Sequence, residues 1–370
     1  MKITITGQGG FIGSHLKNNL EFIQNEFSVN EFNSEIINNQ FELDNLVSNS
    51  DIIVHLAGIN RSSDPEEVYN INYNISKLIK DSIERVNFSG KLIFASSIQE
   101  DYGNQYGNAK KESRELFIES SNRCKYDFCG LIIPNVFGPF CKPNYNSFIS
   151  TFSHNLIHGI KTSIDKKSKV DLIYIDNLID VIISEFRTKS NPKKIIKSDI
   201  STYVNEVYDE LNMFYSNYVL DGIIPELNTE FSVNLFNTFR SFLYNNDFFP
   251  VYYPVNDDER GRFSELIRSN SKSQFSFSTT NKKFVRGNHF HTKKIERFSV
   301  IQGKAEVELR VLGKKQKIKY VLNGSKPAYV DIPIWHIHNI KNIGEETLIT
   351  TFWTNEFYDE KKPDTYYQKV

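Results

Sequence analysis

Tyr106 and Lys110, four residues apart, are a pair whose types and spacing could do chemistry. Residues at positions i and i+4 of a helix lie on one face, so a phenol and an ammonium group would be neighbours. A nearby cation favours the phenolate and lowers the cost of moving a proton at the hydroxyl. The pair predicts proton transfer at Tyr106, whereas on a surface helix the same spacing would have no function.

A second group of candidate residues lies nearer the carboxy terminus, where His289 and His291 are followed by Glu296. In a strand, side chains two residues apart point to the same side, so both imidazoles can converge with the carboxylate. Imidazole nitrogens and carboxylate oxygens are ligands for a divalent ion such as zinc. The group predicts a metal site, and the alternative is a set of hydrogen-bonded core histidines.

Three glycines near the amino terminus could bind phosphate. Gly7, Gly10 and Gly13 follow an apolar segment at residues 2–6 and stand where a helix is expected to begin, at Phe11. Missing side chains let a backbone approach a pyrophosphate, whose charge the free N–H groups of a helix favour. We expect a dinucleotide-binding turn, although a glycine triplet alone could be a flexible turn.

The elements that must position these residues follow from the apolar pattern. Short apolar segments at 51–56, 91–95, 131–133 and 172–175 alternate with amphipathic helices, which predicts a parallel sheet covered on both faces. From about Phe249 short strands alternate with turns, as at 257–261 and 323–325, which favours a small antiparallel barrel or sandwich. We therefore predict an α/β Rossmann-type domain over 1–247 and an all-β barrel over 248–370.

Composition and charge narrow the class of protein. A chain of 370 residues can bury two cores, and its net charge of -1 argues against nucleic acid as a partner. The first residues carry no basic leader and no long apolar window follows, so we expect a cytoplasmic protein without membrane insertion. Cys124, Cys129 and Cys141 lack metal spacing and are expected to be reduced thiols.

The order of the amino-terminal motifs resembles the extended short-chain dehydrogenase/reductase family. The glycine turn is followed by a segment ending at 55–58, by Ser96 and Ser97, and then by Tyr106 and Lys110. The resemblance implies that Ser97 hydrogen-bonds a substrate carbonyl, with Ser96 as the alternative, that Tyr106 donates the proton, and that Lys110 binds the nicotinamide ribose and tunes Tyr106. The dinucleotide-binding residues that it implies are Gly7, Gly10, Phe11, Ile12, Gly13, Leu56, Ala57, Gly58, Lys110 and Val136.

Two details bear on the reaction and the cofactor. Ile98 and Gln99 follow Ser97, where 4,6-dehydratases of the family carry an Asp-Glu pair, so reduction or C4 epimerisation is favoured over dehydration. After the second predicted strand, near 27–29, Glu31 stands where an Arg would hold a 2′-phosphate. Glu31 could bind a 2′-hydroxyl and favour NADH, or it could be an exposed loop acid.

The carboxy-terminal histidines resemble the cupin superfamily, which implies that His289, His291, Glu296 and the distant His338 hold a divalent metal, expected to be zinc. Lys283 and Trp335 stand where the cupin motifs carry glycine, and we leave His336, beside the likelier ligand, outside the set. The strings 258–263 and 286–290 also resemble metal-free sugar-nucleotide epimerases of the cupin fold, in which the histidine at position 289 is the base. Either reading predicts handling of a proton beside a ketone.

Across its full length the chain resembles the CapF (WbjC, FnlB) family of capsular and O-antigen polysaccharide enzymes. The strings that carry the resemblance are 55–61, 134–138, 141–147, 287–289 and 364–366. It implies that a UDP-2-acetamido-2,6-dideoxy-hexos-4-ulose is epimerised at C3 by the barrel and reduced at C4 by NADPH to UDP-2-acetamido-2,6-dideoxy-L-talose, in a homodimer. In the alternative, only the reductase is catalytic and the barrel is a binding or dimerisation module. The residues that it places around the UDP-sugar are Asn60, Arg61, Asn135, Lys142 and Asn146.

Overall fold

The chain forms two compact units, as a computed structural model shows. One contains Met1–Asn212 and Thr229–Asn246, and the other contains Met213–Asn228 and Asp247–Val370. The structure describes residues 1–24, 26–145, 147–164, 167–243, 248, 251, 254–271, 273–291, 294–312, 314–326 and 328–370. The predicted boundary between 247 and 248 stays a prediction, because residue 247 lies outside the described residues.

The first unit contains a parallel sheet of the Rossmann type, as predicted. Its strands are parallel in the order β2-β1-β3-β4-β5-β8. β3 is buried along its whole length, as expected for a strand covered on both faces. The strands are β1 (Lys2–Thr6), β2 (Ser28–Asn30), β3 (Ile52–His55), β4 (Lys91–Ser97), β5 (Asp127–Ile133) and β8 (Asn191–Ile195).

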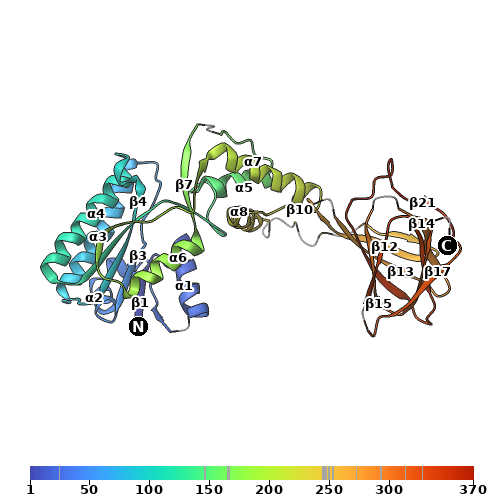
Figure 1. The fold of residues 1–370 in the computed structure, drawn as a ribbon. Coiled ribbons are helices and arrows are strands. Elements are labelled where there is room, and N and C mark those ends of the chain that lie inside the picture. Colours follow the sequence, from blue (N-terminus) through green and yellow to red (C-terminus); the bar gives the residue numbers. More distant parts are fainter. Residues whose placement is uncertain are drawn as a thin grey trace. The chain divides into compact units, whose positions relative to one another are not determined.

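Helices cover both faces of this sheet (Figure 1). α2 (Gln40–Ser48), α3 (Pro65–Arg85) and α4 (Gln105–Cys124) lie on one side, and α1 (Phe11–Asn18) and α6 (Ile175–Ser184) lie on the other. A buried apolar cluster joins α3 and α4 to the strands through residues such as Ile83, Phe94 and Phe117. The short helices of the chain are η1 (Asn19–Gln24), η2 (Ile36–Asn38), η3 (Ile98–Asp101), η4 (Glu185–Arg187) and η5 (Tyr215–Leu220).

A smaller sheet follows the parallel one in the same unit. Its order is β6-β7-β9, in which β6 and β7 are parallel and β7 and β9 antiparallel. α5 and α8 pack together beside it. These elements are β6 (Asn135–Phe137), β7 (Lys169–Tyr174), β9 (Ile200–Tyr203), α5 (Phe148–Ile157), α7 (Val204–Phe214) and α8 (Glu230–Arg240).

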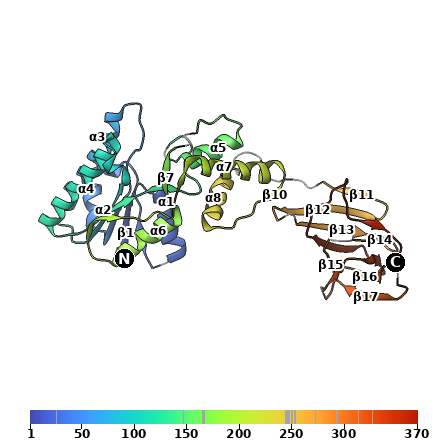
Figure 2. The ribbon, with the colours of Figure 1, turned by 45° about the horizontal axis from the view of Figure 1, so that its top comes forward.

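From residue 254 onward the second unit is all-β, as predicted, and two sheets face each other in it (Figure 2). Val300, Val307, Ile340 and Leu348 come from both sheets and share one buried cluster. The first sheet contains β10 (Ile223–Ile224), β11 (Asn256–Asp258), β12 (Gly261–Ser269), β13 (Gln274–Thr280), β15 (Glu296–Gln302), β18 (Ala328–Ile332) and β20 (Leu348–Thr354). The second contains β14 (Val285–Phe290), β16 (Lys304–Val311), β17 (Lys317–Asn323), β19 (His336–Asn342) and β21 (Tyr366–Tyr367).

Two further predictions concern the whole chain. Among the helices that the structure describes, none has the length and apolar character that crossing a membrane requires. Cys124, Cys129 and Cys141 form no disulfide bond among the described residues.

Candidate functional site

The glycine turn has the conformation that close approach of a phosphate requires. Gly7 has φ +79°, and the N–H of Gly10 donates to the Gly7 carbonyl at 2.9 Å. A Cβ at Gly13 would overlap the backbone of Gly7, so α1 can approach the turn only with glycine there. α1 begins at Phe11 without a side-chain cap, which leaves its first N–H groups open to an anion.

This turn follows β1, which lies beside β3 in the sheet. The strand order reverses here, because β2 lies on the outer side of β1 and β4 lies on the opposite side, next to β3. The Thr6 hydroxyl accepts the N–H groups of Leu56 and Ala57, each at 3.1 Å, and so fixes the loop after β3 beside the glycine turn. A cavity of about 750 Å³ opens here, with Gly7, Gly10 and Ala57 among its walls. Ligands of open α/β sheets bind at such a point. The cavity is also lined by Phe32, Asn33 and Ser34, which the sequence did not single out.

Tyr106 and Lys110 lie together on the first turns of α4, on the helix that their spacing predicts. Lys110 Nζ is buried, lies 5.7 Å from the centre of the Tyr106 ring, and donates to the Ala95 carbonyl at 2.9 Å. A Cβ at Gly58 would stand 3.9 Å from the same Nζ, so the loop after β3 reaches the pair. The first unit therefore brings the glycine turn, this loop and the Tyr-Lys pair to one edge of the sheet.

Burial sets the protonation of the pair. It lowers the pKa of Lys110 to about 8, partly offset by the charge of Glu100, and it raises the pKa of Tyr106 to about 12, with the Tyr145 phenol as a further cause. At neutral pH the lysine is charged and the tyrosine carries its proton. In these protonation states Tyr106 can donate a proton, and Lys110 is the cation beside it.

The two serines at the end of β4 differ in their surroundings. Ser96 is buried and its hydroxyl is hydrogen-bonded to the carboxylate of Glu100, which also accepts two hydrogen bonds of 2.8 Å from Arg114. Ser97 is partly exposed, and its oxygen accepts the Gln99 N–H at 3.2 Å. Because Ser96 is already bound to a buried ion pair, the arrangement favours Ser97 as the hydroxyl for a carbonyl.

The residues predicted for the sugar nucleotide are brought together only in part. The N–H of Asn60 donates to the Tyr145 hydroxyl at 3.4 Å, and Asn135 Nδ2 donates to the Asp171 carbonyl at 3.2 Å. Arg61 and Lys142 are exposed side chains, and Asn146 lies outside the described residues. Tyr145, which meets Asn60 here and helps to raise the pKa of Tyr106, was not singled out from the sequence, although it stands inside the string 141–147 that carries the family resemblance.

The predicted metal ligands form one cluster in the second unit. The ligand atoms of His289, His291, Glu296 and His338 all lie within 4.8 Å of one another. Nε2 of His291 and Nε2 of His338 are each 3.2 Å from Glu296 Oε2. Burial opposes ionisation of Glu296, but the neighbouring imidazoles of His291 and His338 outweigh it and hold the pKa of Glu296 below its ordinary value.

The strands of both sheets bring these ligands together. A bulge in β14 between Gly287 and His289 places His289 opposite His338 of β19, while Glu296 begins β15 in the facing sheet. Lys283 and Trp335, which stand where the predicted cupin motifs would carry glycine, have φ +72° and +60°. Both positions therefore keep a left-handed backbone without glycine.

The cluster has the donor set of a tetrahedral zinc site, three imidazoles and one carboxylate. His338 Nε2 is buried and has no hydrogen-bond partner among the described residues, as expected of a nitrogen whose lone pair faces an ion. Burial, and then the neighbouring His338, lower the pKa of His289 to about 3, so its imidazole is neutral and able to coordinate. The residues present thus fit a divalent metal. His336 lies outside the cluster.

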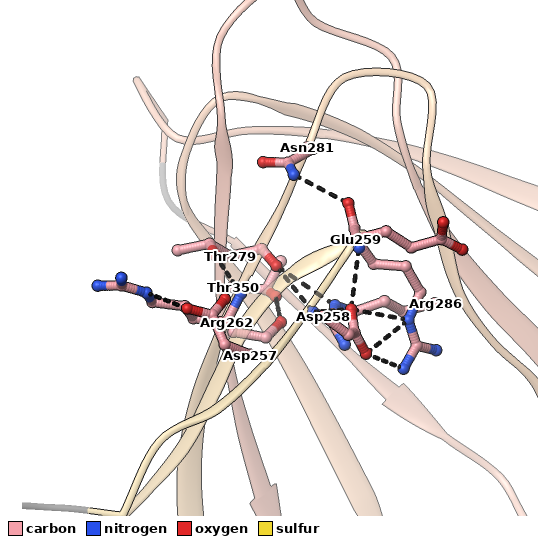
Figure 3. A network of polar contacts seen from close by, with 10 residues as sticks. Asp257, Asp258, Glu259, Arg262, Thr279, Asn281, Arg286 and Thr350 are labelled. Atoms are coloured by element: carbon pink, nitrogen blue, oxygen red, sulfur yellow. Dashed lines mark hydrogen bonds and ion pairs between the residues drawn. The ribbon is translucent and has the colours of Figure 1, made fainter.

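The strings that resemble metal-free epimerases also meet in this unit (Figure 3). Arg286 Nη2 lies 3.9 Å from Asp258 and donates to the Thr279 carbonyl at 3.1 Å. Arg260 binds the same Asp258 carboxylate and is the main cause that lowers its pKa to about 2. This network ties the β11–β12 hairpin to β13 and β14.

Known proteins match the chain over both units. Residues 3–196 match the NAD dependent epimerase/dehydratase family, and residues 256–366 match the polysaccharide biosynthesis C-terminal domain. A UDP-2-acetamido-2,6-beta-L-arabino-hexul-4-ose reductase of Pseudomonas aeruginosa is 31% identical over 370 residues, which cover 99% of this chain and 98% of that protein.

Solved structures agree. The crystal structure of the capsular polysaccharide assembling protein CapF from Staphylococcus aureus is 30% identical, has a TM-score of 0.86 and covers 100% of both chains. A UDP-glucose 4-epimerase of Thermotoga maritima, 18% identical with a TM-score of 0.56, shares the fold over 66% of this chain and 99% of its own. The chain therefore belongs to the family of CapF, in which an NAD dependent epimerase/dehydratase domain precedes a polysaccharide biosynthesis C-terminal domain.

Proposed function

We propose that the protein is a bifunctional sugar-nucleotide enzyme. Its second unit, a cupin barrel, epimerises C3 of a UDP-2-acetamido-2,6-dideoxy-hexos-4-ulose, and its first unit reduces the C4 ketone to give UDP-2-acetamido-2,6-dideoxy-L-talose for capsule or O-antigen synthesis. The observation that carries the proposal is that one chain holds both a Tyr-Lys pair with a buried lysine at the edge of a Rossmann sheet and a cluster of three histidines and a glutamate, in which His291 and His338 are buried. The name of the Pseudomonas aeruginosa relative supports the reduction.

The two steps follow from the chemistry of a C4 ketone. A ketone acidifies the hydrogen on the neighbouring carbon, so a base can remove it from C3 and return it to the other face. Reduction of C4 removes the ketone and with it that acidity. The barrel must therefore act first, and the reductase traps the epimerised sugar.

In the reductase step, each residue has one role. NADPH, when bound, supplies the hydride to C4. Tyr106 gives its proton to the C4 oxygen, Ser97 holds that oxygen by a hydrogen bond, and the charge of Lys110 favours the phenolate that remains. The glycine turn and the N–H groups at the start of α1 bind the pyrophosphate.

In the epimerase step, His289, His291, Glu296 and His338 would hold a zinc ion. The ion would stabilise negative charge on the substrate oxygens as a Lewis acid. An alternative is a metal-free reaction in which His289 acts as the base, and its depressed pKa keeps that imidazole unprotonated at neutral pH. In a second alternative the barrel only binds the sugar nucleotide or joins two copies of the chain.

NADPH is the proposed reductant, with NADH as the alternative. Glu31, which would repel a 2′-phosphate, is ion-paired with Lys17 of α1 at 3.0 Å. The positive charge of Lys17 offsets the negative charge of Glu31, so Glu31 need not exclude a 2′-phosphate. We also propose a cytoplasmic homodimer by likeness to the family.

The experiment that tests the proposal separates the two steps. The chain is incubated with the 4-keto UDP-sugar in D₂O, first without NADPH and then with it, and products are followed by NMR and mass spectrometry. We expect deuterium at C3 without NADPH and the talose product with it. Reduction without prior C3 exchange would show that only the reductase is catalytic.

The pH dependence of the reductase should report Lys110. Burial lowers its pKa from 10.5 to about 8, and the ammonium form, which exists below that pH, is the one that assists Tyr106. We expect kcat/KM for NADPH to be high below this pKa and to fall as the pH rises through it. Initial rates between about pH 6 and about pH 10 measure this. A slower Lys110→Arg variant, which stays charged, should lack the alkaline fall, and an unchanged fall would contradict the assignment.

A further inference from the structure

The ring of His291 is held from behind by the last part of the chain. Its Nδ1 lies 2.6 Å from the backbone carbonyl of Asp364, while its Nε2 faces Glu296. A carbonyl accepts only, so Nδ1 is the N–H donor, and in the neutral ring, the form that can bind a metal, Nε2 carries the lone pair. Metal-binding histidines are commonly fixed in this way by a partner of the second nitrogen.

Asp364 belongs to a segment that lies along β14, which we call the C-terminal strap, residues 363–370. β21 of the strap pairs antiparallel with β14, with Tyr367 opposite His289. The N–H of Gln368 donates to the Asn288 carbonyl at 2.9 Å. The strap therefore follows the strand that carries His289 and ends one residue before His291.

Asp364 itself is buried and has an unusual backbone. Its φ is +40°, a region in which Asn, Asp and Gly are the tolerated residues. Its Oδ2 accepts the N–H of Lys294 at 2.8 Å, and Lys294 Nζ donates to the Pro363 carbonyl at 2.8 Å. Lys294 is two residues before Glu296. The Asp364 carbonyl therefore contacts one proposed ligand, His291, and its carboxylate binds the segment that leads into a second one, Glu296.

We propose that Asp364 is a positioning residue for the metal cluster, which the strap clamps onto β14. Its carbonyl selects the His291 tautomer that presents Nε2, and its carboxylate fixes the approach to Glu296. This inference rests on the proposed metal. It adds a residue 73 positions from His291 in the sequence that touches neither the metal nor the substrate.

Three substitutions in the full chain separate the contributions of Asp364. Asp364→Asn keeps both the tolerance of positive φ and a side-chain acceptor for Lys294. Asp364→Gly keeps the backbone freedom but loses the acceptor, and Asp364→Ala loses both. Lys362→Ala, an exposed residue just before the strap, is the control. If the alanine variant fails to fold, the Asn and Gly variants still carry the comparison.

The probes are Zn²⁺, titrated into chelator-treated protein, and the visible spectrum of the Co²⁺ form, which reports ligand geometry. We expect the Asn and Lys362 variants to match the wild type, and the Gly variant to bind Zn²⁺ roughly 10- to 100-fold more weakly with an altered Co²⁺ spectrum. Wild-type affinity and spectrum in the Gly variant would overturn the role of Asp364 alone. If the wild type binds no Zn²⁺, the metal cluster fails as well, so the two failures are distinct.

Discussion

Tyr106→Phe should lower the rate of ketone reduction by roughly 10²- to 10⁴-fold, the usual worth of a positioned acid. The substitution keeps the ring beside Lys110 and removes only the hydroxyl, whose pKa of about 12 keeps it protonated at working pH. Water would then have to protonate the C4 oxygen in a site without a placed donor. Single-turnover oxidation of NADPH with the 4-keto UDP-sugar measures the loss, and NADPH affinity should stay close to wild type.

Tyr102→Phe is the matched control for this prediction. Tyr102 lies four residues before Tyr106 and is 65% exposed, so removal of its hydroxyl should leave the rate unchanged. Deuterium exchange at C3 should survive in Tyr106→Phe, because the epimerase step uses residues of the other unit. A Tyr106→Phe enzyme that still reduces the ketone at the wild-type rate would remove the reductase assignment.

The amino-terminal fold could be predicted because its signals are local. The apolar segment at residues 2–6 forms β1 with the predicted bounds, and α1 begins at Phe11. Tyr106 and Lys110 share a face because both lie in α4, and the spacing within one helix fixes that arrangement. Patterns that span one turn or one strand are readable without knowledge of the rest of the chain.

The surroundings of the candidate sites could not be predicted, because their contacts join distant parts of the sequence. Arg114 of α4 donates a hydrogen bond to Glu100, which lies in the short helix η3. Glu100 is also hydrogen-bonded to the Ser96 hydroxyl. The carbonyl that orients His291 belongs to Asp364, in a short segment with no metal-binding motif of its own. Such contacts follow from how helices and loops pack in three dimensions, which no local pattern encodes.

Two positions where the predicted cupin motifs carry glycine show that a sequence pattern can be stricter than the backbone requires. Lys283 and Trp335 replace glycine, yet both have positive φ. At Trp335 the surroundings enforce the turn, since its N–H donates to the His291 carbonyl at 2.8 Å and its ring stacks on Phe290. Contacts of this kind can offset the steric cost of a side chain in that region.

His338→Ala should abolish C3 exchange, with a loss of at least roughly 100-fold, while the C4 reduction of an already epimerised substrate continues. His338 is completely buried, lies opposite His289 across β14 and β19, and places Nε2 3.2 Å from Glu296. Its removal takes away one of the three imidazoles, and with it one of the two that lower the pKa of Glu296. Deuterium incorporation at C3, measured with metal content on the same sample, tests this.

His336→Ala is the control, since His336 lies on the same strand two residues away and outside the cluster. Exchange lost together with bound metal in His338→Ala would support a metal-assisted epimerase. Exchange in a wild type free of metal would instead point to His289 as the base, because a neutral buried imidazole can accept the C3 proton without an ion. Full exchange in His338→Ala would remove the cluster from the reaction and leave the barrel a non-catalytic role.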